Sequence, residues 1–326
     1  MSIANEINIL KGNIRNAYTS IQNKGGTMPT NKNTENLSSA IDSIPSGGGD
    51  VSDYFTSILP SGGYANKTDS NVTTSGINGS ITKIPNDFQT FGYPTQDTYY
   101  NEKGYALFRG CYNLTDCSAL MNLPTTELNS LREAFRWCSS LQTIPLFDIS
   151  NVKTMDGAFY NCKKLQNIPS FNTVNVTSMN NAFSNCESLT SIPELNTSKV
   201  KSLQSIFYKC TKLETVPLLN CQSCTNIYTI FSGATNITTL GGFQNLGQAY
   251  KTTQSANYAY YKLDLSKQTK LTEQSLINVL NNLYDIATAG CNTQGIVLGA
   301  TNLAKLTSEE GQQALTNAQT KGWTVS

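Results

Sequence analysis

Side chains of the kind that bind ligands recur at one position of an internal repeat. Arg136, Tyr160 and Tyr208 each directly follow a phenylalanine, and Trp137 stands beside the first of them. Aromatic rings stack on sugars or pack against protein receptors, and Tyr, Trp and Arg dominate binding surfaces. We therefore expect these four residues to belong to a receptor-binding surface. The alternative, equally weighted for Trp137, is that they pack against a neighbouring subunit or the N-terminal region.

Catalytic residues are scarce in this chain. It contains no histidine, which excludes Ser-His-Asp and Cys-His catalysis and every histidine-containing metal site. A polysaccharide depolymerase would need paired carboxylates. The acidic residues of the repeats form no distinctive cluster in the sequence: Glu133, Asp156, Glu187, Glu194 and Glu214. We expect no enzymatic activity, no cofactor and no metal, and keep the depolymerase as the weakest alternative.

A repeat of 24 residues organises the middle of the chain. Four segments read alike: "AFRWCSSLQTIP", "AFYNCKKLQNIP", "AFSNCESLTSIP" and "IFYKCTKLETVP". Their columns are Phe135, Phe159, Phe183, Phe207 and Phe231, then Cys138, Cys162, Cys186 and Cys210, with leucine, proline and valine columns beside them. An irregular earlier copy holds Phe108 and Cys111. Such a period predicts stacked coils whose equivalent apolar residues build one continuous core.

Each coil is expected to contain the same local elements. "LQNIP" reads as a short strand that ends at Pro169, and "NNAFSNC" as a tight helical or 3₁₀ corner that turns Phe183 inward. The asparagines of one column, Asn172, Asn196 and Asn220, with Asp148 ahead of them, suit side-chain caps on turn backbone. The fold class predicted is an α/β leucine-rich-repeat solenoid.

The repeated cysteines are interpreted as free, buried thiols. Stacked side chains point in parallel, so neighbouring cysteines do not face each other as a disulfide requires. Each sulfur then acts as a small apolar group with weak hydrogen-bonding capacity. Cys221 and Cys224 form a lone C-x-x-C with no second pair to complete a zinc site, and Cys224 falls in the valine column. We interpret it as a core substitution.

The two flanks differ from the repeats. Residues 1–45 predict two amphipathic helices, followed by a glycine-rich linker. The first helix would serve docking and oligomerisation through one apolar stripe: Ile3, Ile7, Leu10, Ile14, Tyr18 and Ile21. After residue 243 we expect a strand at 261–266, a helix capped by Thr272, a strand at 295–299, a final helix and a closing strand, together covering the last coil.

Composition bears on location and partners. Hydrophobic residues make up 38% and charged residues 14%, with a net charge of +1, so bulk electrostatics indicate neither nucleic acid nor an anionic membrane as partner. No apolar run reaches the roughly 18 residues of a membrane-spanning helix. The first 22 residues carry Glu6 in their only apolar region and lack a cleavage pattern, so we expect synthesis in a host cytoplasm without a secretory signal.

These motifs resemble known families. The unit F-x-x-C-x-x-L-x-x-I-P followed by N-V-x-x-M resembles BspA-like leucine-rich repeats of bacterial surface proteins. The N-terminal "EINILKGNIRNAYTSIQNKGGTMP" and the C-terminal "LTEQSLINVLNNLYDIATAG" are similar to tail and baseplate proteins of phages or prophages from Gram-positive hosts. The resemblance implies a tail-fibre or receptor-binding protein in the virion, docked as a homotrimer by its N-terminal helices.

The expected organisation has four parts: a docking segment at 1–45, a linker with irregular coils at 46–107, the repeat array at 108–243 and a strand–helix cap at 244–326. The leading function is attachment to the tail and recognition of a host-cell glycan or protein by the array. The alternatives are a purely structural baseplate or tail component and a bacterial surface adhesin.

Overall fold

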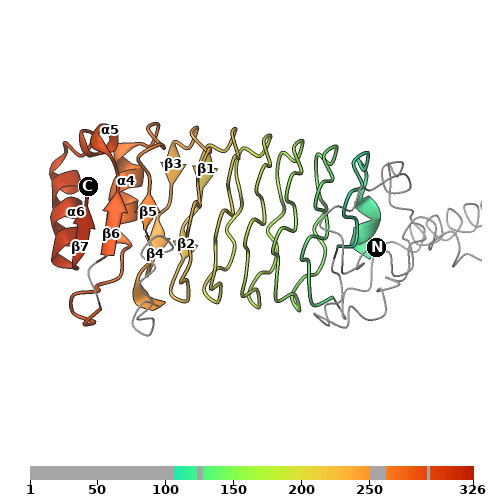
Figure 1. The fold of residues 1–326 in the computed structure, drawn as a ribbon, viewed down its shortest axis with the longest axis horizontal. Coiled ribbons are helices and arrows are strands. Elements are labelled where there is room, and N and C mark those ends of the chain that lie inside the picture. The colour runs from blue at the N-terminus through green and yellow to red at the C-terminus, as the bar shows by residue number, and fades with distance from the viewer. Residues whose placement is uncertain (1–105, 123–127, 250–261, 292–293) are drawn as a thin grey trace, which may run out of the picture. The chain divides into compact units, whose positions relative to one another are not determined.

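The computed structural model describes residues 106–122, 128–249, 262–291 and 294–326. The predicted N-terminal helices and linker lie outside these residues. After a short 3₁₀ helix, η2 (Ser118–Asn122), the chain runs in a succession of similar coils, and the helices and longer strands follow near its C-terminal end (Figure 1).

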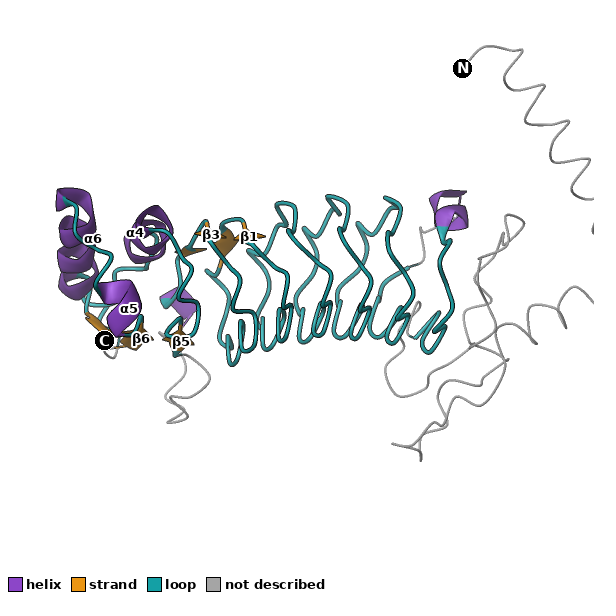
Figure 2. Cartoon of the chain, turned by 90° about the horizontal axis from the view of Figure 1, so that it is seen from above, coloured by secondary structure: helices purple, strands orange, loops and turns teal. Residues whose placement is uncertain are grey.

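Residues 24 apart in the sequence lie side by side in neighbouring coils. Isolated parallel bridges join Ser130 to Thr154, Thr154 to Ser178 and Ser178 to Ser202. The same register continues to Asn226, so the sequence period is also the period of the structure. Figures 1 and 2 show the resulting row of coils from two directions. We infer that this array is a solenoid of the leucine-rich-repeat type.

The phenylalanine column forms the centre of the core. Phe135 and Phe159 stack with ring centroids 5.3 Å apart and planes 4° from parallel, and the stack continues through Phe183 to Phe231. The cysteine, leucine and valine columns are buried beside it. Phe243 ends the stack, because its ring is tilted by 56° from that of Phe231. A coil cannot bury these residues alone, so the core exists only through stacking.

The strand expected in every coil forms only in the last coils. The pairs are parallel: β1 (Thr215–Val216) with β3 (Thr239–Leu240), and β2 (Leu219–Asn220) with β4 (Phe243–Gln244). The segment that ends at Pro169 donates one bond to the preceding coil, from the N–H of Gln166 to the carbonyl of Gln142. A single bond does not make a ladder, so the prediction of a strand is wrong here, although the equivalent residues before Pro217 form β1.

The corner around Phe183 is a series of turns rather than a helix. Ala182 and Ser184 donate to carbonyls three residues back, whereas Asn181, Phe183 and Asn185 donate to the next coil. A helix would keep all of these bonds within the segment, so the prediction of a helix is wrong. The bonds three residues back are of the 3₁₀ type that the prediction also allowed, and Phe183 is buried as expected. Asn181 and Asn185 adopt positive φ angles of 55° and 58°, a conformation that asparagine tolerates better than most residues.

The predicted side-chain caps are confirmed. The Oδ1 atom of Asn196 accepts a hydrogen bond from the N–H of Ser198 at 3.1 Å, and Asn220 does the same for Gln222 at 3.0 Å. Asp148 and Asn172 cap their turns in the same way. The polar column therefore stabilises one bend of each coil.

The C-terminal part contains strands and helices close to those expected. Their bounds are β5 (Leu263–Asp264), α4 (Glu273–Asn281), β6 (Gln294–Val297), α5 (Ala300–Leu303), α6 (Glu309–Thr320) and β7 (Trp323–Val325). Strands β5, β6 and β7 form one parallel sheet. Thr272 caps α4 as predicted, by accepting from the N–H of Ser275. The short helix α5 was not expected from the sequence.

Helix α4 packs on the last coil. The hydroxyl of Ser275 donates to the carbonyl of Thr238 and accepts from the N–H of Leu240. Leu276, Val279 and Leu280 on the same helix are buried. Figure 2 shows α4 directly beyond β3. The apolar end of the array is thereby covered, since Leu240 is also fully buried.

Candidate functional site

The corner at residues 132–137 turns four side chains outward and one ring inward. Glu133 and Trp137 have positive φ angles of 56° and 67°, and the N–H groups of Glu133, Phe135 and Trp137 donate to the next coil. This backbone directs Phe135 into the core, where it is fully buried. Arg132, Glu133, Arg136 and Trp137 remain half-buried at the surface.

Arg136 lies against two aromatic rings. Its guanidinium carbon is 4.8 Å from the ring centroid of Trp137 and 4.5 Å from that of Tyr160. Both distances are within the range of attractive cation–π contacts. A guanidinium between two rings has lost most of its rotational freedom, so its donors are held in fixed directions. Its Nε atom is buried and makes no hydrogen bond with any described residue.

Glu133 joins two arginines of neighbouring coils. Its Oε1 accepts from Arg136 at 2.7 Å, and its Oε2 accepts from Arg109 at 2.6 Å. The guanidinium of Arg109 also lies 5.1 Å from the ring centroid of Trp137. The group formed by Arg109, Glu133, Arg136, Trp137 and Tyr160 is called the arginine–aromatic cluster below. It carries two positive charges and one negative charge.

A polar ladder continues from this cluster across the next coils. Arg132 donates to Oδ2 of Asp156 at 2.9 Å, and Oδ1 of Asp156 accepts from the hydroxyl of Ser178 and the N–H of Asn180. Asn180 in turn accepts from Ser202. These bonds order the side chains beside the cluster and hold the neighbouring coils in register.

The structure brings three of the four predicted site residues together. Arg136, Trp137 and Tyr160 are in direct contact, whereas Tyr208 lies two coils further on, beyond Ser184 in the same column. The ring of Tyr208 packs instead under the ammonium of Lys209, at 5.2 Å. All four side chains are half-buried. They pack on their neighbours in the array.

Arg109 and Glu133 were not predicted as members of the site. The spacing of 27 residues between Phe108 and Phe135 also places Arg109 in the column of Arg136. This spacing is the sequence signal that places the two arginines side by side in neighbouring coils. The role of Glu133 had no such signal, because it depends on a positive φ angle.

Three of the five carboxylates considered for catalysis are engaged in ion pairs. Glu133 binds two arginines, Asp156 binds Arg132, and Glu187 pairs with Lys163 at 2.9 Å on the exposed surface. Such pairing is typical of structural side chains. In the described part of the chain, no group of three Cys, Asp or Glu side chains is placed to hold a metal ion. Likewise, none of the helices described there has the length and apolarity to cross a membrane.

The cysteine column is buried, and each thiol has a defined partner. Cys162 donates to the carbonyl of Phe135 at 3.0 Å, Cys186 to that of Phe159 at 3.2 Å and Cys210 to that of Phe183 at 3.0 Å. Burial raises the pKa of Cys210 to about 12 and that of Cys186 well above its ordinary value. The thiols are therefore protonated donors, as the sequence predicted, with no nucleophilic character at neutral pH.

The C-x-x-C pair is also buried in a coil. Cys224 occupies the valine column with no exposed surface, as expected for a core substitution. A hydrogen bond to Cys224, with burial, raises the pKa of Cys221. Cys221 stands in the column of Thr173 and Thr197, whose hydroxyls each donate to a carbonyl of the next coil. The predicted docking residues (Ile3, Ile7, Leu10, Ile14, Tyr18 and Ile21) lie outside the described residues.

A protein-family model matches part of the chain. Residues 129–241 match a family model described as a Mycoplasma protein of unknown function, DUF285. No curated protein matches the chain. The matched residues lie within the array and contain most of the arginine–aromatic cluster. Over this part, the chain is thus similar to a Mycoplasma repeat family that is related to BspA-like surface repeat proteins.

Proposed function

We propose that this protein is a phage or prophage tail-fibre or receptor-binding protein, which docks through its N-terminal segment and recognises the host cell through its repeat array. The observation that carries the proposal is the arginine–aromatic cluster, in which Arg136 lies between Trp137 and Tyr160. The motif resemblance of the flanks to tail proteins supports the docking role, and the similarity to surface repeat proteins supports the recognition role.

The cluster suits a cell-surface ligand for physical reasons. Aromatic faces bind the apolar face of a sugar ring, and guanidinium donors bind its hydroxyl or carboxylate oxygens. The contacts between Arg136, Glu133 and the two rings already fix these groups, so binding costs little side-chain entropy. The stacked coils beneath the cluster are rigid, which favours a preformed site. A protein receptor would use the same aromatic and arginine anchors.

The test is binding of fluorescently labelled full-length protein to intact cells of a panel that includes mycoplasmas and Gram-positive bacteria. Tyr160→Ser removes one ring and reproduces Ser184 of the same column, so the coil should tolerate it. Tyr208→Ser is the matched control, because Tyr208 lies in that column but outside the cluster. We expect Tyr160→Ser to lower cell binding by at least about tenfold, as for a hot-spot residue, and Tyr208→Ser to leave it unchanged.

A purely structural role in the baseplate is the second candidate. Tight ion pairing of Glu133 with Arg109 and Arg136 would serve equally to hold coils together. Absence of binding to every cell type, with both variants folded, would favour this role. A bacterial surface adhesin would bind cells but would not assemble with tail proteins. Release of reducing ends from host glycans would point instead to a depolymerase.

A further inference from the structure

One corner of each coil carries a ladder in which all hydrogen bonds run in the same direction. Phe159 donates from its N–H to the carbonyl of Ala182, Phe183 to that of Ile206 and Phe207 to that of Ile230. The residues two before and two after each phenylalanine donate in the same way. The residue four before donates likewise, as Met155 does to Ser178, so neighbouring coils from Phe135 to Phe231 are joined by four such bonds. The ladder distances are 2.6 to 3.1 Å.

The ladder stops at the coil that contains Phe231. Among the next donors in sequence are the N–H groups of Thr229, Phe231 and Gly233. No carbonyl in the described part of the chain accepts a hydrogen bond from any of the three. Their φ angles continue the pattern of the preceding coils, with 53° at Thr229 and 80° at Gly233. The donors are thus directed as before, towards the C-terminal side, but have no acceptor among the described residues.

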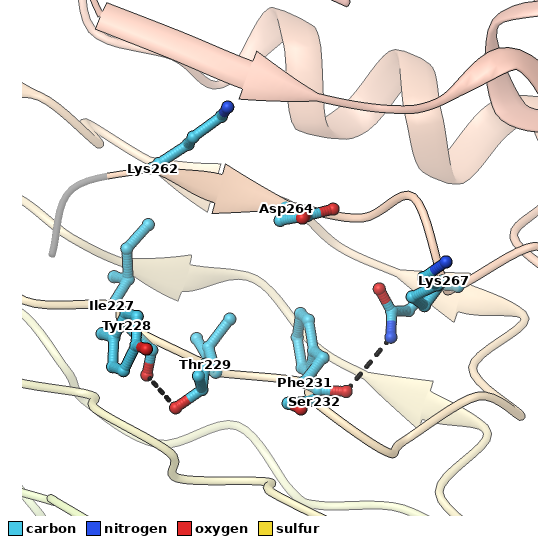
Figure 3. A pocket seen from close by; sticks show the side chains of 10 residues that line it. Ile227, Tyr228, Thr229, Phe231, Ser232, Lys262, Asp264 and Lys267 are labelled. Carbon is cyan, nitrogen blue, oxygen red and sulfur yellow. Dashed lines mark hydrogen bonds between the residues drawn. The ribbon is translucent and has the colours of Figure 1, made fainter. Parts of the chain in front are cut away.

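A cavity lies beside two of these donors, Thr229 and Phe231, whereas Gly233 is not among its lining residues. It has a volume of about 310 Å³ and is lined by residues 227–232 on one side and by Lys262, Asp264, Lys267 and Gln268 on the other (Figure 3). Strand β5 pairs with β6, and none of its described residues accepts a hydrogen bond from these donors. Gln268 spans the gap, since its side-chain amide donates to the carbonyls of Phe231 at 3.1 Å and Ala234 at 3.3 Å.

Gln268 replaces a cysteine at this step of the array. In four of the earlier coils the carbonyl of the phenylalanine accepts from a thiol of the next coil, as Phe183 does from Cys210. A glutamine side chain is longer by two heavy-atom bonds and reaches the same carbonyl across a wider separation. The longer side chain of Gln268 therefore matches the wider separation between its own segment and the coil of Phe231. This separation is not a local irregularity of packing.

We propose that this cavity binds an anionic oxygen group, a carboxylate or a phosphate. Every N–H of the ladder points to the same end, so the aligned peptide dipoles leave partial positive charge at Thr229, Phe231 and Gly233. Backbone N–H groups so exposed are typical anion ligands. Carbonyl oxygens satisfy the equivalent donors in every earlier coil, and an anionic oxygen satisfies them more strongly.

The charges of the opposite wall favour the same ligand class. Lys262 and Lys267 supply two positive charges, against the single negative charge of Asp264. The carboxylate of Asp264 accepts from the N–H of Ser266 at 2.9 Å, which engages one of its oxygens within its own turn. In Figure 3 the ammonium of Lys262 is turned away from the coil. This exposed side chain reaches an anion by rotation about its flexible stem. The proposal is independent of the host-recognition role.

The test is a titration of ¹⁵N-labelled full-length protein followed by amide NMR, with inorganic phosphate in one arm and acetate in the other, at constant ionic strength. We expect the amides of Thr229, Phe231 and Gly233 to shift saturably. Lys262→Gln and Lys267→Gln should each weaken binding by about two- to fivefold, as for a partly exposed charge. Asp264→Asn keeps the acceptor for Ser266 and should tighten binding. Lys199→Gln, on the exposed surface of another coil, is the matched control and should change nothing.

Hydrogen exchange of the ligand-free protein gives a second, independent measurement. The amides of Thr229, Phe231 and Gly233 should exchange faster than those of Ser205, Phe207 and Lys209, which are bonded in the same ladder. Equal protection of the two sets would show that the cavity is closed and would overturn the proposal. So would shifts that do not saturate, or that respond to Lys199→Gln as strongly as to Lys262→Gln.

Discussion

The thiol of Cys186 donates a hydrogen bond to the carbonyl of Phe159, one coil earlier, across 3.2 Å. The same carbonyl also accepts from the N–H of Cys162 within its own coil. One backbone oxygen thus joins a turn and its neighbour. The array repeats this arrangement from coil to coil, so the cysteine contributes more than its volume.

Cys186→Ala should lower the free energy of unfolding by about 1–2 kcal/mol, through the lost hydrogen bond and the small cavity left by the sulfur. Urea unfolding under reducing conditions measures this loss of free energy through the shift of its midpoint. Thr211→Ala is the control, because it removes a side-chain bond to the preceding coil at the exposed surface, and should cost at most about 0.5 kcal/mol. Equal losses of unfolding free energy in the two variants would show that the buried thiol contributes no more than an exposed hydroxyl.

Cysteine labelling should separate Cys291 from the column thiols. Cys291 is half-buried, whereas Cys162, Cys186 and Cys210 are fully buried and protonated. Because the thiolate is the reactive form, iodoacetamide at pH 8 should modify Cys291 first, with the column reacting only on unfolding. Mass spectrometry of the native protein measures the order, and Cys291→Ser should abolish the fast phase. Labelling of Cys186 at the rate of Cys291 would contradict the buried column.

Asn161 should tolerate glycine better than alanine. Its φ angle is 65°, and Gly233 occupies the same place in a later coil at 80°. An alanine in this left-handed conformation costs about 1 kcal/mol, whereas glycine adopts it freely. Asn161→Ala should therefore lower the thermal midpoint, and Asn161→Gly should not. Lys164→Ala, at an exposed site in the same coil, serves as the control. A lower midpoint for the glycine variant than for the alanine variant would refute the argument.

Stability should depend on the ionisation of Glu273. Its Oε1 accepts from the N–H and the hydroxyl of Ser308, and these bonds lower the pKa of Glu273. A lowered pKa in the folded state gives stability above the unfolded value of about 4.3, which is lost as pH falls through the folded value. Glu273→Gln should therefore lower the melting temperature at pH 7, and the difference should narrow on acidification.

The control for that experiment is Glu194→Gln, since the Glu194 side chain is exposed on another coil. It should change the melting temperature little at any pH. A difference between Glu273→Gln and the native protein that stays constant down to strongly acidic pH would show that the carboxylate charge contributes nothing. The loss would then come from the altered side-chain geometry alone.

The sequence was most informative where one residue type implies one environment. The phenylalanine, cysteine and leucine columns are buried as their spacing predicted, and Thr272 caps its helix. Apolar periodicity and capping chemistry are local signals that tertiary contacts reinforce. The side-chain caps of Asn196 and Asn220 belong to the same class, because an Asx turn needs only the residue and its own backbone.

The corner was predicted wrongly because its conformation is set by neighbouring coils. "NNAFSNC" has the composition of a helical turn, yet alternate N–H groups are bonded to the next coil. The left-handed positions hold Glu133, Trp137, Lys209 and Thr229 as well as asparagine and glycine, so residue type signals them only in part. The contact of Arg109 with Glu133 depends on that backbone and on the irregular spacing of 27 residues.

The one-directional corner ladder bears on how such an array can change length. Each internal coil offers four ladder donors on one side and four ladder acceptors on the other. A duplicated block of 24 residues, such as 157–180, would present matching groups to both neighbours and the same ring to the stack. Gain or loss of a whole 24-residue unit leaves no N–H or carbonyl group of the ladder unpaired. Gain or loss of part of a unit would shift every residue column out of register. The number of coils can therefore change by whole units, while the hydrogen bonds and ring contacts between neighbouring coils stay the same.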